Sequence, residues 1–104
     1  MADYNPLGAA MVCDHVNALA TLSEHQVYVT PRVGDPLAGV DLDRFDVVVI
    51  HYSLAMAQWS YLAEPTRRKL RRFQGLKAAF IQDEYRFITD TTEALVDLGI
   101  GLVF

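Results

Sequence analysis

The chain has 104 residues, of which 52% are hydrophobic and 21% are charged, and its formal net charge is −4. This composition is typical of a globular protein rather than a disordered one, and the length allows one domain at most. The acidic balance makes the chain a poor general binder of nucleic acid or of anionic membranes.

A single cysteine, Cys13, excludes an internal disulfide, which fits a reducing compartment. The first residues lack the basic stretch and apolar run of a secretory signal. No apolar stretch approaches the ~20 residues that a membrane-spanning helix needs. We therefore expect a cytoplasmic protein.

The first third of the chain predicts a helix, a strand and a loop. Asn5 and Pro6 suggest a helix cap followed by a proline in the first turn, and apolar residues recur at helical spacing up to Leu22, so we expect a helix over residues 6–23. Residues 26–30, QVYVT, predict a short strand. The prolines and glycines that follow predict a loop over residues 31–44.

The middle of the chain predicts a buried strand and a helix. Residues 45–51, FDVVVIH, contain four consecutive β-branched residues, which indicate a strand buried on both faces. The pattern over residues 52–64 indicates no particular element. Residues 65–73 predict a helix with Gly75 near its end. Three apolar residues share one face there: Leu62, Leu70 and Phe73.

The last quarter predicts two strands around a helix. Residues 78–82, AAFIQ, are a second candidate for a buried strand. Asp90 and Glu93 have the spacing of a capping box, and the helix they open should stop at Gly99. Residues 100–104, IGLVF, predict a final strand.

The order of these elements predicts the fold class. Strands that alternate with helices imply βαβ crossovers and a parallel sheet covered by helices, so we expect a three-layer α/β fold of Rossmann type in a single domain over residues 1–104. The first helix has no strand before it, and the last strand runs into the chain end. We therefore expect a partial domain, whose open sheet edge would favour self-association.

Ligands of such sheets bind outside the carboxyl ends of the strands, which selects three loops. The candidate binding residues in them are Asn5, Gly8, Tyr52, Gln82, Tyr85 and Arg86. Asp83 or Glu84 could act as a general base or bond a sugar hydroxyl, and Arg86 could hold an anionic group. The alternative is a solvated strand end in which a carboxylate pairs with Arg86.

Two histidines and a basic run complete the candidates. His51 could act as an acid or base with Asp83 as its orienting carboxylate, or be bonded only to backbone, whereas His15 reads as a helix-surface residue. We expect no metal site, because no third ligand has suitable spacing. Five basic residues could contact acidic lipid headgroups or an acidic partner, or form a solvated helix face: Arg67, Arg68, Lys69, Arg71 and Arg72.

Three stretches stand out when taken together: FDVVVIHYSL at 45–54, RKLRRFQGLKAAFIQDEYR at 68–86 and EALVDLGIGLVF at 93–104. They resemble the N-terminal domain of bacterial GT-B glycosyltransferases of the family 1/family 4 type. YNPLGAAMVCDHVNAL, at 4–19, is similar to the first loop and helix of that domain. The resemblance covers nearly the whole chain, and its most specific parts are IHYSL and FIQDEYR.

The resemblance implies an enzyme of two Rossmann-like domains that transfers a sugar from a nucleotide-sugar donor to a glycan or lipid-linked acceptor, without a cofactor or an essential metal. It places Asn5 and Gly8 near the donor phosphates. It places His51 and residues 83–86 on the acceptor side. Many such enzymes meet membrane-linked acceptors through basic surface on this half.

The resemblance also implies that this chain alone does not catalyse transfer, because the donor-binding domain and its glutamate-containing motif are not in it. The alternative function is a non-enzymatic Rossmann-like module that binds a partner through residues 82–86 or the basic run. A dinucleotide-binding protein is disfavoured, since the sequence has neither GxGxxG after a strand nor GxxxxGK[ST].

Overall fold

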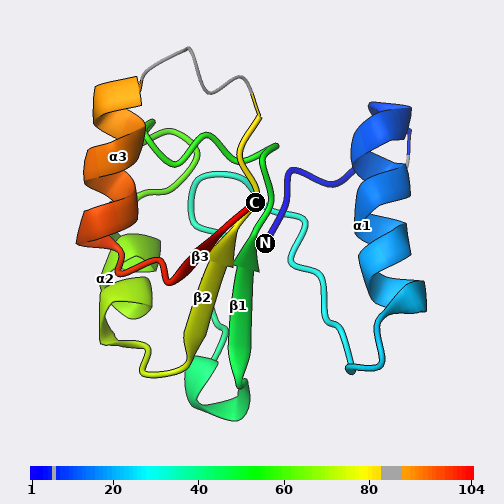
Figure 1. The fold of residues 1–104 in the computed structure, drawn as a ribbon, viewed down its shortest axis with the longest axis horizontal. Helices are drawn as coiled ribbons and strands as arrows, with labels where there is room; N and C mark the ends of the chain where they lie inside the picture. Colours follow the sequence, from blue (N-terminus) through cyan, green and yellow to red (C-terminus); the bar gives the residue numbers. More distant parts are fainter. Residues whose placement is uncertain (6, 83–87) are drawn as a thin grey trace.

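The computed structural model of the chain describes residues 1–5, 7–82 and 88–104. These residues form an α/β fold with three α-helices and a three-stranded parallel sheet (Figure 1). The elements in chain order are α1 (Ala10–Leu22), the 3-10 helix η1 (Leu42–Arg44), β1 (Val47–Ile50), α2 (Glu64–Arg72), β2 (Leu76–Ala79), α3 (Ile88–Asp97) and β3 (Leu102–Val103).

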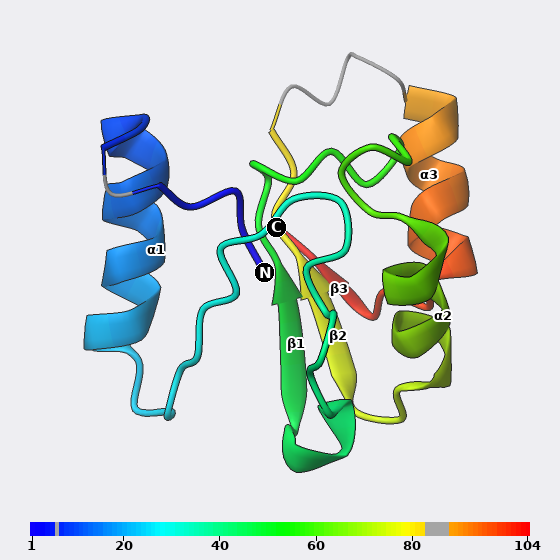
Figure 2. The same ribbon diagram turned by 180° about the vertical axis from the view of Figure 1, so that it is seen from behind.

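The sheet has the strand order β1–β2–β3, and both pairs are parallel. Val47 lies opposite Leu76, and Ala78 lies opposite Leu102. Helices α2 and α3 connect the strands on one side of the sheet, and α1 stands on the other side (Figures 1 and 2). This arrangement confirms the predicted parallel α/β class.

The hydrophobic core lies between the sheet and the pair α2 and α3. Val48 and Ile50 of β1 point into it, as does Leu98, and Leu70 comes from α2. Complete burial of such a side chain stabilises the fold by about 1.5–3 kcal/mol. The predicted apolar face is confirmed, because all three of its members belong to this cluster: Leu62, Leu70 and Phe73.

The opposite face of β1 is largely uncovered. Val48 is 6% exposed, whereas its neighbour Val47 is 46% exposed and Val49 is half-buried. The prediction of a strand buried on both faces is therefore wrong. The reason is that α1 packs poorly against this face: Val16 is the buried residue among the 13 described residues of the helix, so the β1 face stays open.

Residues 26–30 do not form the predicted strand, so that prediction is wrong. The segment lies outside the sheet, and the side chains of residues 26–29 are exposed. Its last residue makes one contact with the N-terminus, since the Ala2 N–H donates to the Thr30 carbonyl at 3.2 Å. A strand needs a partner for its backbone groups, and β-branched residues alone do not supply one.

The helix starts also differ from the predictions. Helix α1 begins at Ala10, with Ala9 at the cap position and no side-chain bond there. Asn5 does not cap it, because its Oδ1 accepts from the Leu7 N–H in a local turn at 3.0 Å. Helix α3 begins at Ile88, so Asp90 lies inside its first turn and the predicted capping box is wrong.

The predicted end of α3 is confirmed. Gly99 has φ +67°, which favours glycine, and its N–H donates to the Val96 carbonyl. The Ile100 N–H donates to the Leu95 carbonyl, which completes a glycine-terminated helix end of the Schellman type. Helix α2 matches its prediction within one residue, and β2 starts two residues earlier than predicted, at Leu76.

Candidate functional site

The carboxyl ends of β1 and β2 open at one edge of the sheet, because the two strands are parallel. The Phe80 N–H donates to the Ile50 carbonyl, and the Ile81 N–H donates to the Phe104 carbonyl, both at 2.9 Å. These bonds fix the directions in which the segments after β1 and β2 leave the sheet. The residues after both strands therefore meet at one place, as ligand sites of α/β sheets require.

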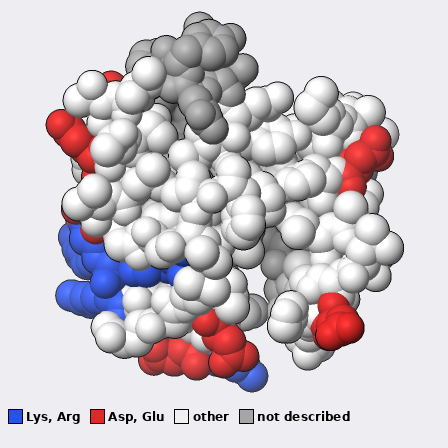
Figure 3. Space-filling model, in the orientation of Figure 1, with Lys and Arg blue, Asp and Glu red and all other residues white. Residues whose placement is uncertain are grey.

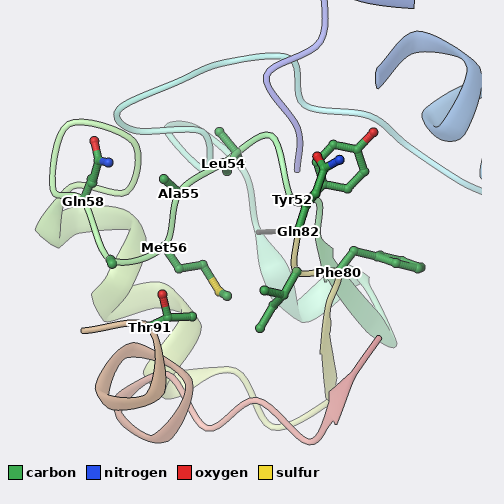
Figure 4. Close-up of a pocket in the computed structure, with 10 residues that line it drawn as sticks. Tyr52, Leu54, Ala55, Met56, Gln58, Phe80, Gln82 and Thr91 are labelled. Carbon is green, nitrogen blue, oxygen red and sulfur yellow. The ribbon is translucent and has the colours of Figure 1, made fainter. Parts of the chain in front are cut away.

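A pocket of about 200 Å³ lies at this edge (Figure 4). One wall is a run of turns after β1, in which the Leu54 N–H bonds the His51 carbonyl and the Gln58 N–H bonds the Ala55 carbonyl. The opposite wall follows β2, and α3 contributes Thr91. The lining residues are Tyr52, Leu54, Ala55, Met56, Ala57, Gln58, Phe80, Ile81, Gln82 and Thr91.

The lining combines an apolar floor with neutral hydrogen-bonding groups. Leu54 and Met56 are buried beneath the pocket. In Figure 4 the Gln58 amide lies on one side and the Gln82 amide on the other, with the Met56 side chain between them. No Lys, Arg, Asp or Glu lines it among the described residues. Amides and hydroxyls both donate and accept, so this pocket suits a neutral ligand that carries hydroxyl groups.

His51 lies behind this pocket in a series of hydrogen bonds. Its side chain is only 2% exposed. The Ser53 N–H donates to Nδ1 at 3.1 Å, so Nδ1 is an acceptor and the ring proton sits on Nε2. Nε2 then donates to Nδ1 of His15 at 2.8 Å. Burial, with smaller contributions from the charges of His15 and the chain N-terminus, lowers the pKa of His51 to about 4, so His51 is neutral at pH 7.

His15 is not the isolated helix-surface residue that the sequence suggests. Its ring centroid lies 4.9 Å from that of His51 and 4.8 Å from that of Phe80, and it also approaches Tyr52 at 5.8 Å. The interpretation of His15 as a free surface residue is therefore wrong. The 36 positions that separate the two histidines hid the contact, since only the fold brings α1 to the carboxyl end of β1.

The chain N-terminus closes the same cluster. The Met1 ammonium donates to the Val49 carbonyl at 2.8 Å, and the His51 N–H donates to the Met1 carbonyl at 3.0 Å. The Asp3 N–H donates to Ser53 Oγ at 2.9 Å. Burial lowers the pKa of the Met1 ammonium to about 6. Residues 1–3 thus run along the open side of β1 at its carboxyl end.

The structure brings together some of the predicted site residues. Tyr52 and Gln82 line the pocket. His51 does not line it, but its ring lies 4.0 Å from the Tyr52 ring, between centroids. Asn5 and Gly8 form the turn before α1 and do not reach the pocket, since the Gly8 N–H bonds the Asn5 carbonyl there.

Four predicted residues lie outside the described part of the chain. They are Asp83, Glu84, Tyr85 and Arg86. The pairing of His51 with Asp83 and the catalytic roles of His51, Asp83 and Glu84 therefore stay predictions. Within the described ranges, no group of three or more His, Cys, Asp or Glu side chains could hold a metal ion.

The basic run on α2 is mostly engaged within the fold. Arg67 is buried, and its Nε donates to the Leu62 carbonyl at 2.6 Å while Nη2 donates to the Met56 carbonyl. Its guanidinium carbon lies 4.4 Å from the centre of the Trp59 ring. Arg67 therefore holds the turns that build one wall of the pocket and is not available at a membrane surface.

Two more cations of the run have partners. Lys69 donates to the carbonyls of Leu37 and Val40 at 2.7 and 3.0 Å. Arg71 forms salt bridges with Glu64 and Asp97 on the surface. Arg68 and Arg72 are exposed, and Figure 3 shows the basic surface at the lower left, over α2. The predicted membrane contact stays a prediction, with fewer free cations than the sequence suggested.

No helix in the described part of the chain combines the length and apolarity needed to cross a membrane. No family model matches the chain, and no curated protein and no solved structure is significantly similar to it. The resemblance to glycosyltransferases therefore stays a prediction, and the function has to be argued from the site.

Proposed function

We propose that the chain is the Rossmann-like, acceptor-side domain of a GT-B glycosyltransferase and that its pocket receives a neutral, hydroxyl-rich acceptor. The observation that carries the proposal is that the described residues lining the pocket at the carboxyl ends of β1 and β2 are all neutral. This edge is where α/β sheets bind ligands. It is also the edge of the sheet at which the resemblance to glycosyltransferases implies the acceptor side.

The lining matches the chemistry of a sugar. The amides of Gln58 and Gln82 and the hydroxyl of Thr91 can donate to and accept from ring hydroxyls. The Met56 side chain and the other apolar floor residues offer contact to the C–H face of a sugar ring. Such pockets with apolar walls and few polar groups are typical of small-molecule sites.

The same lining argues against the nucleotide-sugar donor as the occupant. Binding of a diphosphate usually involves Arg or Lys side chains or a helix N-terminus. The described lining residues include no cation. The donor would then bind mainly to the second domain of the enzyme, and we expect no sugar transfer by this chain alone.

The test is isothermal titration of the chain with a panel of neutral methyl glycosides. We expect Gln58→Leu to weaken the binding of a responding glycoside by about tenfold, because one or two hydrogen bonds are lost without a change in overall charge. Gln74→Leu is the matched control, since Gln74 is exposed and outside the pocket. Equal affinities for the two variants would contradict the proposal, as would a panel without any binder.

A non-enzymatic interaction module is the second candidate, and the exposed end of the sheet favours it. Leu102, Val103 and Phe104 are all exposed, and Phe104 reaches 63%. The Phe104 ring stacks on that of Phe80, with 5.1 Å between centroids. Sedimentation velocity separates the candidates: a module that self-associates here sediments faster as its concentration rises, and Phe104→Ser abolishes this dependence on concentration.

A further inference from the structure

A second pocket, of about 430 Å³, is lined by the turns after β1 and by helices α2 and α3. It adjoins the strand-end pocket of Figure 4, because Ala57 lines both. Consecutive residues on each wall also line different pockets. Gln58 lines the strand-end pocket and Trp59 the second one. On α3, Thr91 lines the strand-end pocket and Asp90 the second one. One extended ligand can therefore occupy both pockets.

Three carboxylates of α3 line the second pocket, which we therefore call the acidic pocket: Asp90, Glu93 and Asp97. They are three and four positions apart, so they share one face of the helix. Asp97 is neutralised by Arg71, with 2.8 Å between Nη2 and Oδ2. The salt bridges among the described residues involve neither Asp90 nor Glu93, and both side chains are exposed. These two carboxylates can therefore pair with a cation of a ligand.

Arg67 reaches the acidic pocket from α2. It is only 4% exposed, and its Nε and Nη2 donate to the carbonyls of Leu62 and Met56. Nη1 bonds to none of the described residues, and no side-chain nitrogen in the described part of the chain is both buried and unpaired. Nη1 therefore opens into the pocket as a donor for a ligand oxygen. One guanidinium faces two carboxylates, so the described lining carries an excess of negative charge.

Trp59 forms an apolar wall of the same pocket. It is 60% exposed, although a large aromatic side chain usually buries most of its surface. Its ring is held in place by Arg67, whose guanidinium carbon lies 4.4 Å from the ring centre. Covering the exposed indole with an apolar surface, such as the C–H face of a sugar ring, is favourable.

We propose that the acidic pocket binds an amino sugar through its protonated amino group. The ammonium lies between Asp90 and Glu93, and charge-assisted bonds of this kind are stronger than neutral ones. A ring hydroxyl accepts from Nη1 of Arg67, and the C–H face of the ring covers Trp59. Because the two pockets adjoin, this sugar is the unit next to the neutral unit of the acceptor in the strand-end pocket. That placement rests on the proposed function, whereas the binding of the amine does not.

The test uses pairs of methyl glycosides in which one member carries an aminomethyl group and the other a hydroxymethyl group. At pH 7 the amine is protonated. Trp59 is the only tryptophan of the chain, so its fluorescence reports the acidic pocket. The signals of Gln58 and Gln82 in ¹H–¹⁵N spectra report the strand-end pocket. We expect the amino member of at least one pair to bind about fivefold tighter than its partner and to change the Trp59 fluorescence.

Two double variants give the test a matched control. Asp90→Asn with Glu93→Gln keeps the shape of the pocket and should abolish the preference for the amine. Asp14→Asn with Glu24→Gln removes the same charge at exposed positions outside the pocket and should keep the preference. Equal affinities within every pair would overturn the proposal. So would a preference that survives the first double variant, or one that both double variants abolish.

The two signals separate this proposal from the proposed function. An amino glycoside that shifts Gln58 and Gln82 but leaves the Trp59 fluorescence unchanged would overturn the acidic pocket and support the strand-end pocket. A fluorescence response to the amine, with no response of Gln58 and Gln82 to any neutral glycoside, would support the acidic pocket and contradict the proposed function. No binding by any glycoside would overturn both.

Discussion

At the scale of single residues, three buried or half-buried nitrogen groups lie together at the carboxyl end of β1. Burial lowers the pKa values of His51 and of the Met1 amino group, and His15 bonds to the His51 ring. The sequence identified His51 as notable but could not show its partners. The ring contacts His15 and Ser53, and the His51 backbone N–H donates to the Met1 carbonyl.

The lowered pKa values predict how stability depends on pH. The pKa of Met1 falls from 8.0 to about 6, and that of His51 from 6.5 to about 4. The unfolded chain therefore binds protons at higher pH than the folded chain. The free energy of unfolding is highest above pH 8. Protonation of Met1 lowers it between pH 8 and 6, and protonation of His51 lowers it between pH 6.5 and 4. We expect a loss on the order of 3 kcal/mol from each of the two groups, measured by urea unfolding at each pH.

Two variants separate the contributions. Acetylation of Met1 should remove the decrease between pH 8 and 6, and His51→Gln should flatten the curve below pH 6.5. His25→Gln is the control, because His25 is exposed and should leave the curve unchanged. A wild-type stability that rises as the pH falls from 8 to 4 would contradict this assignment.

Arg67 offers a second test at this scale. Its guanidinium satisfies the carbonyls of Leu62 and Met56, so Arg67→Leu leaves both carbonyls unpaired inside the protein. We expect a loss of about 2–3 kcal/mol in the free energy of unfolding. Arg68→Leu, at the exposed neighbouring position, should change it by less than about 0.5 kcal/mol. Similar losses for both variants would show that Arg67 has no special role.

At the scale of elements, the sequence predicted the helix boundaries that depend on neighbouring residues alone. Helix α2 has Pro65 in its first turn, and α3 ends at Gly99, so both were recognised. The predicted strand at 26–30 and the capping role of Asn5 were wrong. A strand depends on a partner strand, and a cap depends on the exact first turn, neither of which a short segment contains.

Gly75 tests the connection between α2 and β2. A Cβ at this position would overlap the Phe73 ring and the Asp46 carbonyl oxygen. Gly75→Ala should therefore destabilise the fold by about 2 kcal/mol or more. Gly101→Ala is the control, because the nearest atom to an added Cβ there is Leu76 Cδ1 at 3.5 Å, an ordinary contact distance. Thermal unfolding of both variants measures the effect, and we expect little change in the melting temperature for Gly101→Ala.

A reversed order of the two alanine variants would contradict this description of the α2–β2 turn. The sequence marked Gly75 only as a residue near the end of a helix. Its importance comes from the close approach of β1 to the turn through Asp46, which depends on the parallel register of Val47 with Leu76.

At the scale of the whole molecule, the packing is uneven. Helices α2 and α3 share a core with the sheet, whereas α1 is attached mainly through Val16 and His15. We expect amides of α1 to exchange with deuterium at least about tenfold faster than those of α2, because fewer buried contacts oppose local opening. His15→Ala should increase the exchange of α1 without affecting α2. Equal protection of both helices would contradict the uneven packing.

The pocket is also a property of the whole molecule. The sequence placed a site at the strand ends and named Tyr52 and Gln82, which line the pocket. It missed Gln58 and Thr91. Gln58 lies in a stretch of turns with no periodic signal, and Thr91 belongs to a helix that only the fold brings to the same edge.

We propose that the carboxyl ends of β1 and β2 bind a neutral, hydroxyl-rich molecule. The most direct measurement is a titration of the ¹⁵N-labelled chain with neutral methyl glycosides, followed by ¹H–¹⁵N correlation spectra. We predict shifts at four lining residues, Tyr52, Gln58, Gln82 and Thr91, and none at Gln74. Spectra that stay unchanged at saturating glycoside, or shifts confined to the basic surface of α2, would contradict the claim.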